Sequence, residues 1–355
     1  MRRFTMILLL LLLLLPSALS EGTDILITFT GDCTLGSEEH TRPRRTSFDN
    51  YIFDYGYSYP FEKVQDIIAH DDVTVINLEN VFYPHTANRV EKTYNFRGPP
   101  EFVEILKEGS IELSFLGNNH SGDYGPQGLR STVEILDEAG LGWFGVPYPS
   151  LQTWIYEKDG IKVGFTGSYI GYWTRNREDL RHSFERLRAE GCAVIIAVMH
   201  GGMEYNPRQG KDQQNFANFL LRAGADAVVG HHPHVLQGVE RIGHANIVYS
   251  LGNFSFGGNK DLRATQTMLA QLRLSFGPDK RYLGQQLNLI PAHVSGTLQY
   301  NNFQPVLVTG DEAKAVIDQV NKYSTYTLNP YVEGVGALQD FLPAPEAALL
   351  PRDPE

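Results

Sequence analysis

The sequence of 355 residues has few cysteines, no excess of basic residues and only one long hydrophobic run. Its formal net charge is −11, which argues against the strongly basic surface with which proteins follow nucleic-acid phosphates. We therefore expect no nucleic-acid partner, and we expect any polyanion to be bound locally. No internal repeat is visible, and a 42% hydrophobic composition predicts a chain that folds around a large core.

The two cysteines are not expected to form a disulfide. Cys33 follows the end of one predicted strand, and Cys192 begins another. A strand of seven residues is about 23 Å long. If the two strands run parallel in one sheet, the thiols lie near opposite edges, beyond the ~7 Å Cα separation that a disulfide tolerates.

The long hydrophobic run lies at the N-terminus. Arg2 and Arg3 precede the apolar residues 7–15, which are followed by Pro16 and small residues up to Ser20. This order is typical of a secretory signal, and the run is shorter than the ~20 residues of a spanning helix. We predict a signal peptide over residues 1–20 and an exported protein, either periplasmic, on the cell surface or secreted. An uncleaved membrane anchor is the alternative.

Apolar, β-branched segments recur along the chain, and each ends in polar residues. They are residues 24–30 before Asp32, 73–78 before Glu79, 111–116 before Asn118, Asn119 and His120, 193–199 before His200, and 227–230 before His231, His232, Pro233 and His234. Helical periodicity appears between them, over residues 61–70, 100–107, 128–139, 179–190 and 212–223. The alternation predicts an α/β fold with a parallel sheet, whose site forms at the carboxyl ends of the strands.

Beyond residue 245 the pattern changes to closely spaced strands. We predict an antiparallel second sheet from residues 247–250, 267–276, 286–291 and 303–308, and a final helix over 310–322. The predicted organisation is one domain over residues 21–324 and a Pro-rich tail over 325–355, of which residues 342–355 are expected to be mobile.

The polar residues at the strand ends are suitable metal ligands. A cation that polarises a phosphoryl or acyl oxygen needs rigid oxygen and imidazole ligands, which Asp32, Glu79, Asn119, His200, His232 and His234 supply. Each residue alone has an ordinary alternative as a helix cap, a turn residue or a surface histidine. Their recurrence favours a site for one or two divalent metal ions, with Mn, Zn and Fe equally suited.

Several motifs occur in an order that resembles the CapA family of poly-γ-glutamate capsule proteins, over roughly residues 24–322. They are Asn77-Leu78-Glu79, Phe96-Arg97-Gly98-Pro99-Pro100, Asn118-Asn119-His120 with Asp123-Tyr124-Gly125, His200 with Glu204-Tyr205, Gly230-His231-His232-Pro233-His234 and Ser250-Leu251-Gly252-Asn253-Phe254.

The resemblance implies a fold similar to calcineurin-like metallophosphoesterases, with two packed mixed sheets between helices in four α/β/β/α layers. It implies that Asp32 is the first-strand ligand, that Glu79 is the bridging carboxylate, and that His120 is the general acid. Asn119 would be the amide ligand, with His200, His232 and His234 as imidazole ligands. One departure is Thr34, which stands where phosphoesterases of this fold carry a histidine.

Four further residues are candidates near the site. Asp123 either orients His120 or begins a turn. Arg97 either clamps a substrate carboxylate or phosphate or is an ordinary surface residue. Glu204 is either a supporting residue of the site or a loop carboxylate, and Asn253 reaches the site only if the second sheet packs against it.

The resemblance implies a capsular polymer function, with a metal-dependent hydrolase or transferase acting on poly-γ-glutamate or a small phosphoester. The alternatives are a non-catalytic accessory subunit of a membrane-bound capsule synthesis machinery and a generic exported metallophosphatase. The sequence leaves the substrate, the metal and the oligomeric state open.

Overall fold

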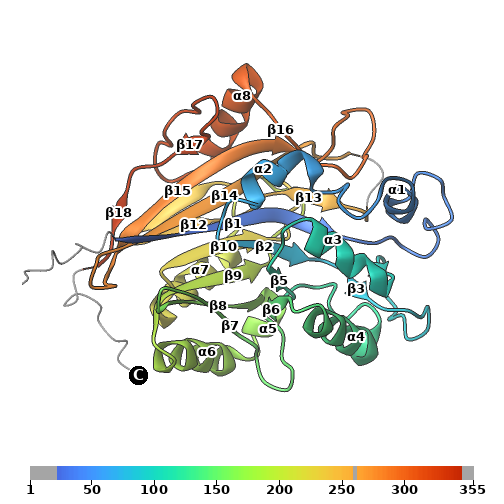
Figure 1. Ribbon diagram of the computed structural model, residues 1–355, viewed down its shortest axis with the longest axis horizontal. Helices are drawn as coiled ribbons and strands as arrows, with labels where there is room; N and C mark the ends of the chain where they lie inside the picture. Colours follow the sequence, from blue (N-terminus) through green and yellow to red (C-terminus); the bar gives the residue numbers. More distant parts are fainter. Residues whose placement is uncertain (1–21, 259–261, 346–355) are drawn as a thin grey trace, which may run out of the picture.

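A computed structural model describes residues 22–258 and 262–345. Two mixed β-sheets lie against each other at the centre of the molecule, with helices on their outer sides (Figure 1). Within the described ranges, no helix combines the length and the apolar character needed to cross a membrane. The predicted signal peptide, residues 1–20, lies outside the described residues.

The first sheet has the strand order β16-β15-β14-β1-β2-β5-β6, and three further short strands pair with β1 or β15. Its strands run parallel from β1 to β6, whereas β14 pairs antiparallel with β1 and β15 pairs antiparallel with β14. The bounds are β1 (Thr23–Thr34), β2 (Val73–Leu78), β5 (Leu113–Phe115), β6 (Gly142–Phe144), β13 (Asn253–Phe256), β14 (Gln266–Phe276), β15 (Tyr282–His293), β16 (Val306–Leu307), β17 (Ala337–Leu338) and β18 (Leu342–Pro343).

The second sheet has the order β11-β12-β10-β9-β8-β7 and is parallel at its centre. Its strands are β7 (Trp154–Lys158), β8 (Ile161–Tyr169), β9 (Cys192–His200), β10 (Ala227–His231), β11 (Val239–Ile242) and β12 (Ala245–Val248). A separate pair joins β3 (Val81–Phe82) to β4 (Arg97–Gly98).

The helices complete the four layers that the resemblance implied. They are α1 (Phe48–Tyr55), η1 (Glu62–Val64), α2 (Gln65–Ile68), η2 (Pro100–Phe102), α3 (Val103–Glu108), α4 (Gly125–Glu138), α5 (Ile170–Trp173), α6 (Arg177–Ala189), α7 (Lys211–Ala223) and α8 (Gly310–Asn321). The helices α1 to α4 share a buried cluster with the first sheet, and α6 and α7 share another with the second. A third cluster fills the space between the sheets.

Strand β9 shows why the central strands have continuous apolar sequences. Val194, Ile196 and Val198 join the cluster between the sheets. Ile195 and Met199 join the cluster under the helices, because side chains alternate across a strand. Both faces of β9 are therefore buried, as expected for a parallel strand between helices and a second sheet.

The predicted separation into a parallel sheet and a later antiparallel sheet is wrong. Strand β14 extends the first sheet by antiparallel pairing with β1, β15 pairs antiparallel with β14, and β12 pairs with β10 in the second sheet. The five strands that deliver polar residues are divided between the sheets, with β1, β2 and β5 in one and β9 and β10 in the other. The site therefore lies where the carboxyl ends of two stacked sheets meet.

The C-terminal part of the described chain packs on the first sheet. Strands β17 and β18 both pair with β15, and Ala337 is fully buried. The structured region thus continues past the predicted boundary at residue 324, because these residues find an unpaired edge of β15. Residues 346–355 of the predicted tail lie outside the described residues. The two cysteines are buried free thiols, which confirms the absence of a disulfide between them.

Candidate metal centre

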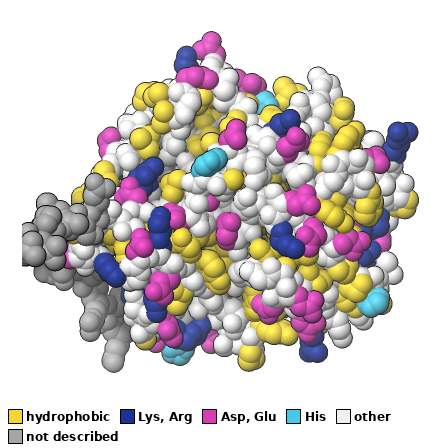
Figure 2. Space-filling model, viewed as in Figure 1, with side chains coloured by type: hydrophobic (Ala, Val, Ile, Leu, Met, Phe, Trp, Pro, Cys, Tyr) yellow, Lys and Arg dark blue, Asp and Glu magenta, His cyan; other side chains and the backbone are white. Residues whose placement is uncertain are grey.

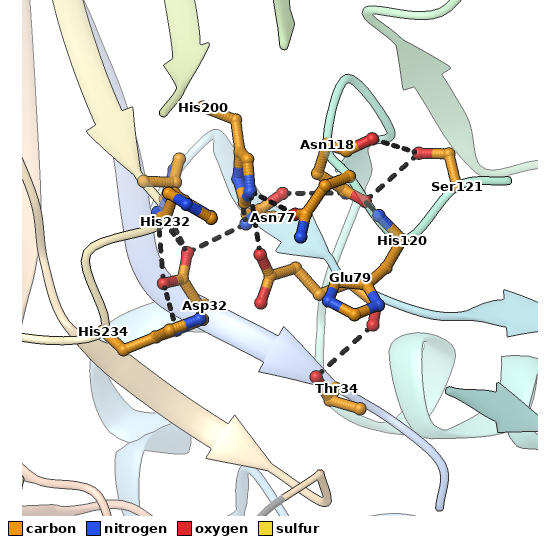
Figure 3. A network of polar contacts seen from close by, with 12 residues as sticks. Asp32, Thr34, Asn77, Glu79, Asn118, His120, Ser121, His200, His232 and His234 are labelled. Carbon is orange, nitrogen blue, oxygen red and sulfur yellow. Dashed lines mark hydrogen bonds and ion pairs between the residues drawn. The ribbon is translucent and has the colours of Figure 1, made fainter. Parts of the chain in front are cut away.

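Four strand ends bring five of the six predicted ligands together. Asp32 lies near the end of β1, Glu79 follows β2, and His200 ends β9; all three are fully buried. His232 and His234 follow β10 on the turn around Pro233. In Figure 3 these five side chains point toward one another, with Asn77 between Asp32 and His200.

The turn after β10 has an unusual backbone. His232 has φ 99° and His234 has φ 58°, in the left-handed region that non-glycine residues rarely adopt. The backbone N–H of His232 points at the Asp32 carboxylate, with N···O distances of 3.4 and 3.3 Å. Strained residues of this kind concentrate at functional sites, where the surrounding contacts hold them in place.

The Asp32 carboxylate contacts imidazoles from the second sheet. His231 Nδ1 lies 3.2 Å from Oδ1, and His234 Nδ1 lies 3.1 Å from Oδ2. Burial alone would raise the pKa of Asp32, but these two contacts hold that pKa well below its usual range. Burial would lower the pKa of His234, but the bond to Asp32 and the charge of Glu79 raise it to about 9.

Three potential ligand atoms converge on the other side of the cluster. His200 Nε2 lies 2.7 Å from Asn119 Oδ1 and 3.1 Å from Glu79 Oε1. Neither oxygen of the Glu79 carboxylate receives a hydrogen bond from the described residues, although both are buried. Burial and the negative charge of Asp32 raise the pKa of Glu79 well above its usual value.

The imidazoles on this side favour the neutral form that binds metals. Burial and the nearby His232 lower the pKa of His200 well below its usual value. Burial and the nearby His234 lower the pKa of His232 to about 4. His232 Nδ1 is also buried without a hydrogen-bond partner.

These unpaired atoms fit a divalent cation. Buried carboxylate oxygens without donors are costly unless they coordinate a cation or become protonated. In the part of the chain that the structure describes, ligand atoms within 4.8 Å of one another occur in three groups, namely Glu79, His200 and His232; Asp32, Glu79 and His234; and Glu204, His232 and His234. Glu79 belongs to two of the groups, in keeping with the bridging position implied for it.

Buried amides hold the candidate ligands in place. Asn77 donates a side-chain hydrogen bond to Asp32 Oδ1 (2.8 Å) and its Nδ2 lies 3.2 Å from His200 Nδ1. Asn118 donates to Asn77 Oδ1 (3.0 Å) and accepts from the backbone N–H of His120 (2.9 Å). One network thus connects both sheets and the loop after β5.

His120 and Asp123 form a buried pair beside the cluster. His120 Nδ1 lies 2.9 Å from Asp123 Oδ2, which also accepts a hydrogen bond from the backbone N–H of Phe96 (2.6 Å). Lys92 contacts Asp123 Oδ1 and donates to the backbone carbonyl of Asn119 (2.8 Å). Burial lowers the pKa of His120, against the opposing effect of Asp123. Asp123 thus makes the contact with His120 that an orienting role requires, and that role stays a prediction.

The other candidates have different surroundings. Arg97 is buried, and its guanidinium donates to Glu39 (2.6 Å) and to the carbonyl of Tyr83 (2.6 Å). These two donors therefore bind groups of the protein and not a ligand. Glu204 is exposed and close to His232 and His234. Asn253 Oδ1 lies 2.8 Å from His234 Nδ1, because β13 pairs with β1 at Asp32.

Sequence reasoning missed several contributors. Asn77 stands two residues before Glu79, and a two-residue spacing on a strand indicates a shared face, so a signal existed. His231 and Asn118 belong to motifs in which the neighbouring residues are the predicted ligands. Lys92 lies in a loop between β3 and β4 that shows no pattern.

The fold and the cluster define an α/β/β/α sandwich protein with a carboxylate, amide and imidazole site at the open ends of its two sheets. The sequence matches the family "Bacterial capsule synthesis protein PGA_cap" over residues 26–258. The chain therefore belongs to this family of capsule synthesis proteins.

Individual relatives agree with this assignment. The chain is similar to "Capsule biosynthesis protein CapA" of Bacillus anthracis, with 28% identity over 258 residues, which is 66% of this chain and 61% of that protein. It is similar to "PGA biosynthesis protein CapA" of Bacillus subtilis, with 27% identity over 259 residues, 68% of this chain and 66% of that protein. A "Probable polyglutamine synthesis accessory protein" of Mycobacterium tuberculosis is 26% identical over 229 residues, 56% of this chain and 60% of that protein. The chain thus matches less than two thirds of the length of each.

Proposed function

We propose that the chain is an exported, metal-dependent hydrolase or transferase that acts on poly-γ-glutamate or a related anionic capsular polymer. The observation that carries the proposal is the convergence of Glu79, Asn119 and His200 around unpaired carboxylate oxygens, next to the His120–Asp123 pair. Export is proposed from the composition of residues 1–20, and membrane-bound capsule synthesis machinery is the proposed partner.

The chain's own residues would divide the work at such a site. Glu79, Asn119, His200 and His232 would hold a first cation, and Asp32, Glu79 and His234 would hold a second. A bound divalent cation supplies Lewis-acid polarisation of an acyl or phosphoryl oxygen. Asp123 fixes Nδ1 of His120, which leaves Nε2 to exchange a proton with the substrate.

The surface charge supports a polymer bound locally. On the face shown in Figure 2, Lys and Arg side chains are dispersed among Asp and Glu side chains and form no large basic patch. With a net charge of −11, the chain repels a polyanion over most of its surface. Recognition would then depend on the cluster and on individual arginines near it, and a nucleic-acid partner is not proposed.

The test combines metal analysis with turnover. Protein purified from its native compartment is expected to contain one or two equivalents of Mn, Zn or Fe by elemental analysis. Asn119→Ala and His232→Ala are expected to lower metal content and cleavage of γ-linked glutamate oligomers together, whereas Arg208→Gln, an exposed control, should change neither. A folded wild type that contains no metal and takes none up would contradict the proposal.

A non-catalytic accessory role is the second candidate, and Thr34 favours it. Thr34 stands where related phosphoesterases carry a histidine, and its hydroxyl lies 3.4 Å from the Glu79 carbonyl. Cells that carry Asn119→Ala or His232→Ala and still produce normal amounts of polymer would support the accessory role over catalysis.

A further inference from the structure

A pocket of about 130 Å³ opens beside the candidate metal centre. His120 and His234 line it together with the aromatic residues Tyr94, Phe96, Tyr205 and Phe256. Among the described residues that line it, Arg263 and Glu204 are the charged ones besides the histidines. The pocket therefore combines the candidate proton-transfer residue, a candidate metal ligand and one arginine.

Aromatic rings form an ordered apolar lining in this pocket. The Phe96 ring lies 4.5 Å from the His120 ring and 6.0 Å from the Phe256 ring, between centroids. Phe256 in turn lies 5.2 Å from His234. Tyr94 stacks on Phe96 at 6.4 Å and remains 51% exposed, so the lining reaches the solvent. Such a surface suits the methylene groups of a ligand.

Tyr205 holds Arg263 at the pocket. The backbone N–H of Tyr205 donates to the carbonyl of Pro233 (2.8 Å), and Tyr205 has φ 58°, so the loop is fixed to the histidine turn. The Arg263 guanidinium carbon lies 5.3 Å from the centroid of the Tyr205 ring, a cation–π distance. Stacking on the ring leaves the edge of the guanidinium available for hydrogen bonds.

The charges in the pocket are separated. The carboxylate of Glu204 lies with His232 and His234 in one group of candidate metal ligands. Arg97, the arginine that the sequence favoured, is committed to Glu39 and Tyr83. Arg263 is therefore the arginine that a substrate in this pocket would meet.

We propose that Arg263 binds an oxyanion of the substrate while the aromatic lining of Phe96 and Phe256 receives its methylene groups. This inference rests on the proposed function, because it places the substrate beside the metal cluster. A γ-linked glutamate chain has the required chemistry, since each residue carries two methylene groups and a free carboxylate. A phosphate group is the other oxyanion that a guanidinium fork recognises.

The test measures affinity and does not depend on turnover. The full chain, in one defined metal state, is titrated calorimetrically with a short γ-linked glutamate oligomer and, separately, with inorganic phosphate. Arg263→Gln is expected to lower the affinity for one of these two probes about tenfold, the loss typical of a charge-assisted hydrogen bond. Arg263→Lys should retain less than the wild-type affinity, because an ammonium cannot bind bidentately.

The matched control is Arg208→Gln. Arg208 also lies over a tyrosine, with its guanidinium carbon 5.2 Å from the Tyr323 ring centroid, but it does not line the pocket. A loss for the oligomer alone identifies a carboxylate, and a loss for phosphate alone identifies a phosphate group. Wild-type affinity of Arg263→Gln for both probes, or an equal loss in Arg208→Gln, would overturn the proposal. Since binding is the readout, the result is decisive for Arg263 even if the chain is not catalytic.

Discussion

Replacement of Glu79 by Gln should have opposite effects on the metal-free and the metal-bound protein. Glu79 is fully buried, and both of its carboxylate oxygens lack hydrogen-bond donors. Its pKa is raised by burial and by the charge of Asp32. We expect Glu79→Gln to stabilise the metal-free protein and to remove most of the stabilisation that a divalent cation gives.

The gain in stability expected for the metal-free variant follows from proton binding by Glu79. Because the pKa of Glu79 is higher in the folded than in the unfolded state, the folded protein binds more protons above the ordinary value of about 4.3. Stability therefore falls as the pH rises from that value toward the folded-state pKa. Glutamine does not titrate, so the variant should gain about 1–3 kcal/mol over the wild type at pH 8, the usual cost of an unsatisfied buried group.

The effect of metal has a comparable size. A cation at about 100 times its Kd stabilises the folded wild type by about 2.7 kcal/mol. Thermal unfolding of both proteins, with a chelator and with Mn²⁺, would show this as a Tm change of about 2 °C per kcal/mol. A variant less stable than the wild type in chelator at pH 8, or one with the wild-type response to Mn²⁺, would refute the reasoning.

Glu112→Gln is the matched control. Burial raises the pKa of Glu112 to about 7, and its Oε2 accepts a hydrogen bond from the backbone N–H of Thr74 (2.8 Å), an interaction that a glutamine oxygen can replace. The substitution should increase stability above pH 7 with and without Mn²⁺. A changed response to the metal in this variant would show that the assay does not isolate the cluster.

Three further predictions concern the surroundings of the cluster. Asn77→Ala should cost about 1–3 kcal/mol in urea unfolding, because the carboxylate of Asp32 loses a buried donor, and should weaken Mn²⁺ binding. Arg97→Ala should cost a similar ~1–3 kcal/mol, because the Tyr83 carbonyl loses its guanidinium donor and Glu39 loses one of its partners, with an unchanged Mn²⁺ affinity. Asp123→Asn should lower the pKa of His120 by about one unit, seen by NMR titration, since an opposing charge is lost; an unchanged midpoint would contradict the pairing.

The residues at the strand ends were accessible from the sequence because each belongs to a local pattern. An apolar run followed by Asp32, Glu79 or His200 indicates both a strand and its functional end. The division of those strands between two sheets was not accessible, because pairing joins residues far apart in the chain. Strand β1, for example, lies between β2 and β14, and the residues of β14 come more than two hundred positions after those of β1.

The residues contributed by loops were the least predictable. Lys92 and Arg263 lie in segments without hydrophobic periodicity, and only the folded chain shows that they approach His120 and Tyr205. Arg97 illustrates the converse, because a conspicuous motif arginine has its donors occupied by Glu39 and a backbone carbonyl. Motif membership identifies residues under constraint but does not distinguish structural from ligand-binding use.

Thr34 bears on how many cations the cluster binds. No imidazole comes from its strand, and Asp32 instead contacts His231 and His234 of the second sheet. The group of Glu79, His200 and His232 contains histidines whose pKa is lowered, so these imidazoles are neutral and ready to bind.

The second group, Asp32, Glu79 and His234, contains a histidine whose pKa is raised to about 9, and a cation there must displace its proton. We therefore expect one tight equivalent of Mn²⁺ at pH 7 and a second only as the pH approaches 9, measured by calorimetric titration at both values. At a pH below the pKa of His234, displacing its proton costs about 1.4 kcal/mol of binding free energy for each unit between that pH and the pKa. Two equivalents of equal affinity at pH 7 would contradict this order, and would mean that His234 does not hold its proton against the metal.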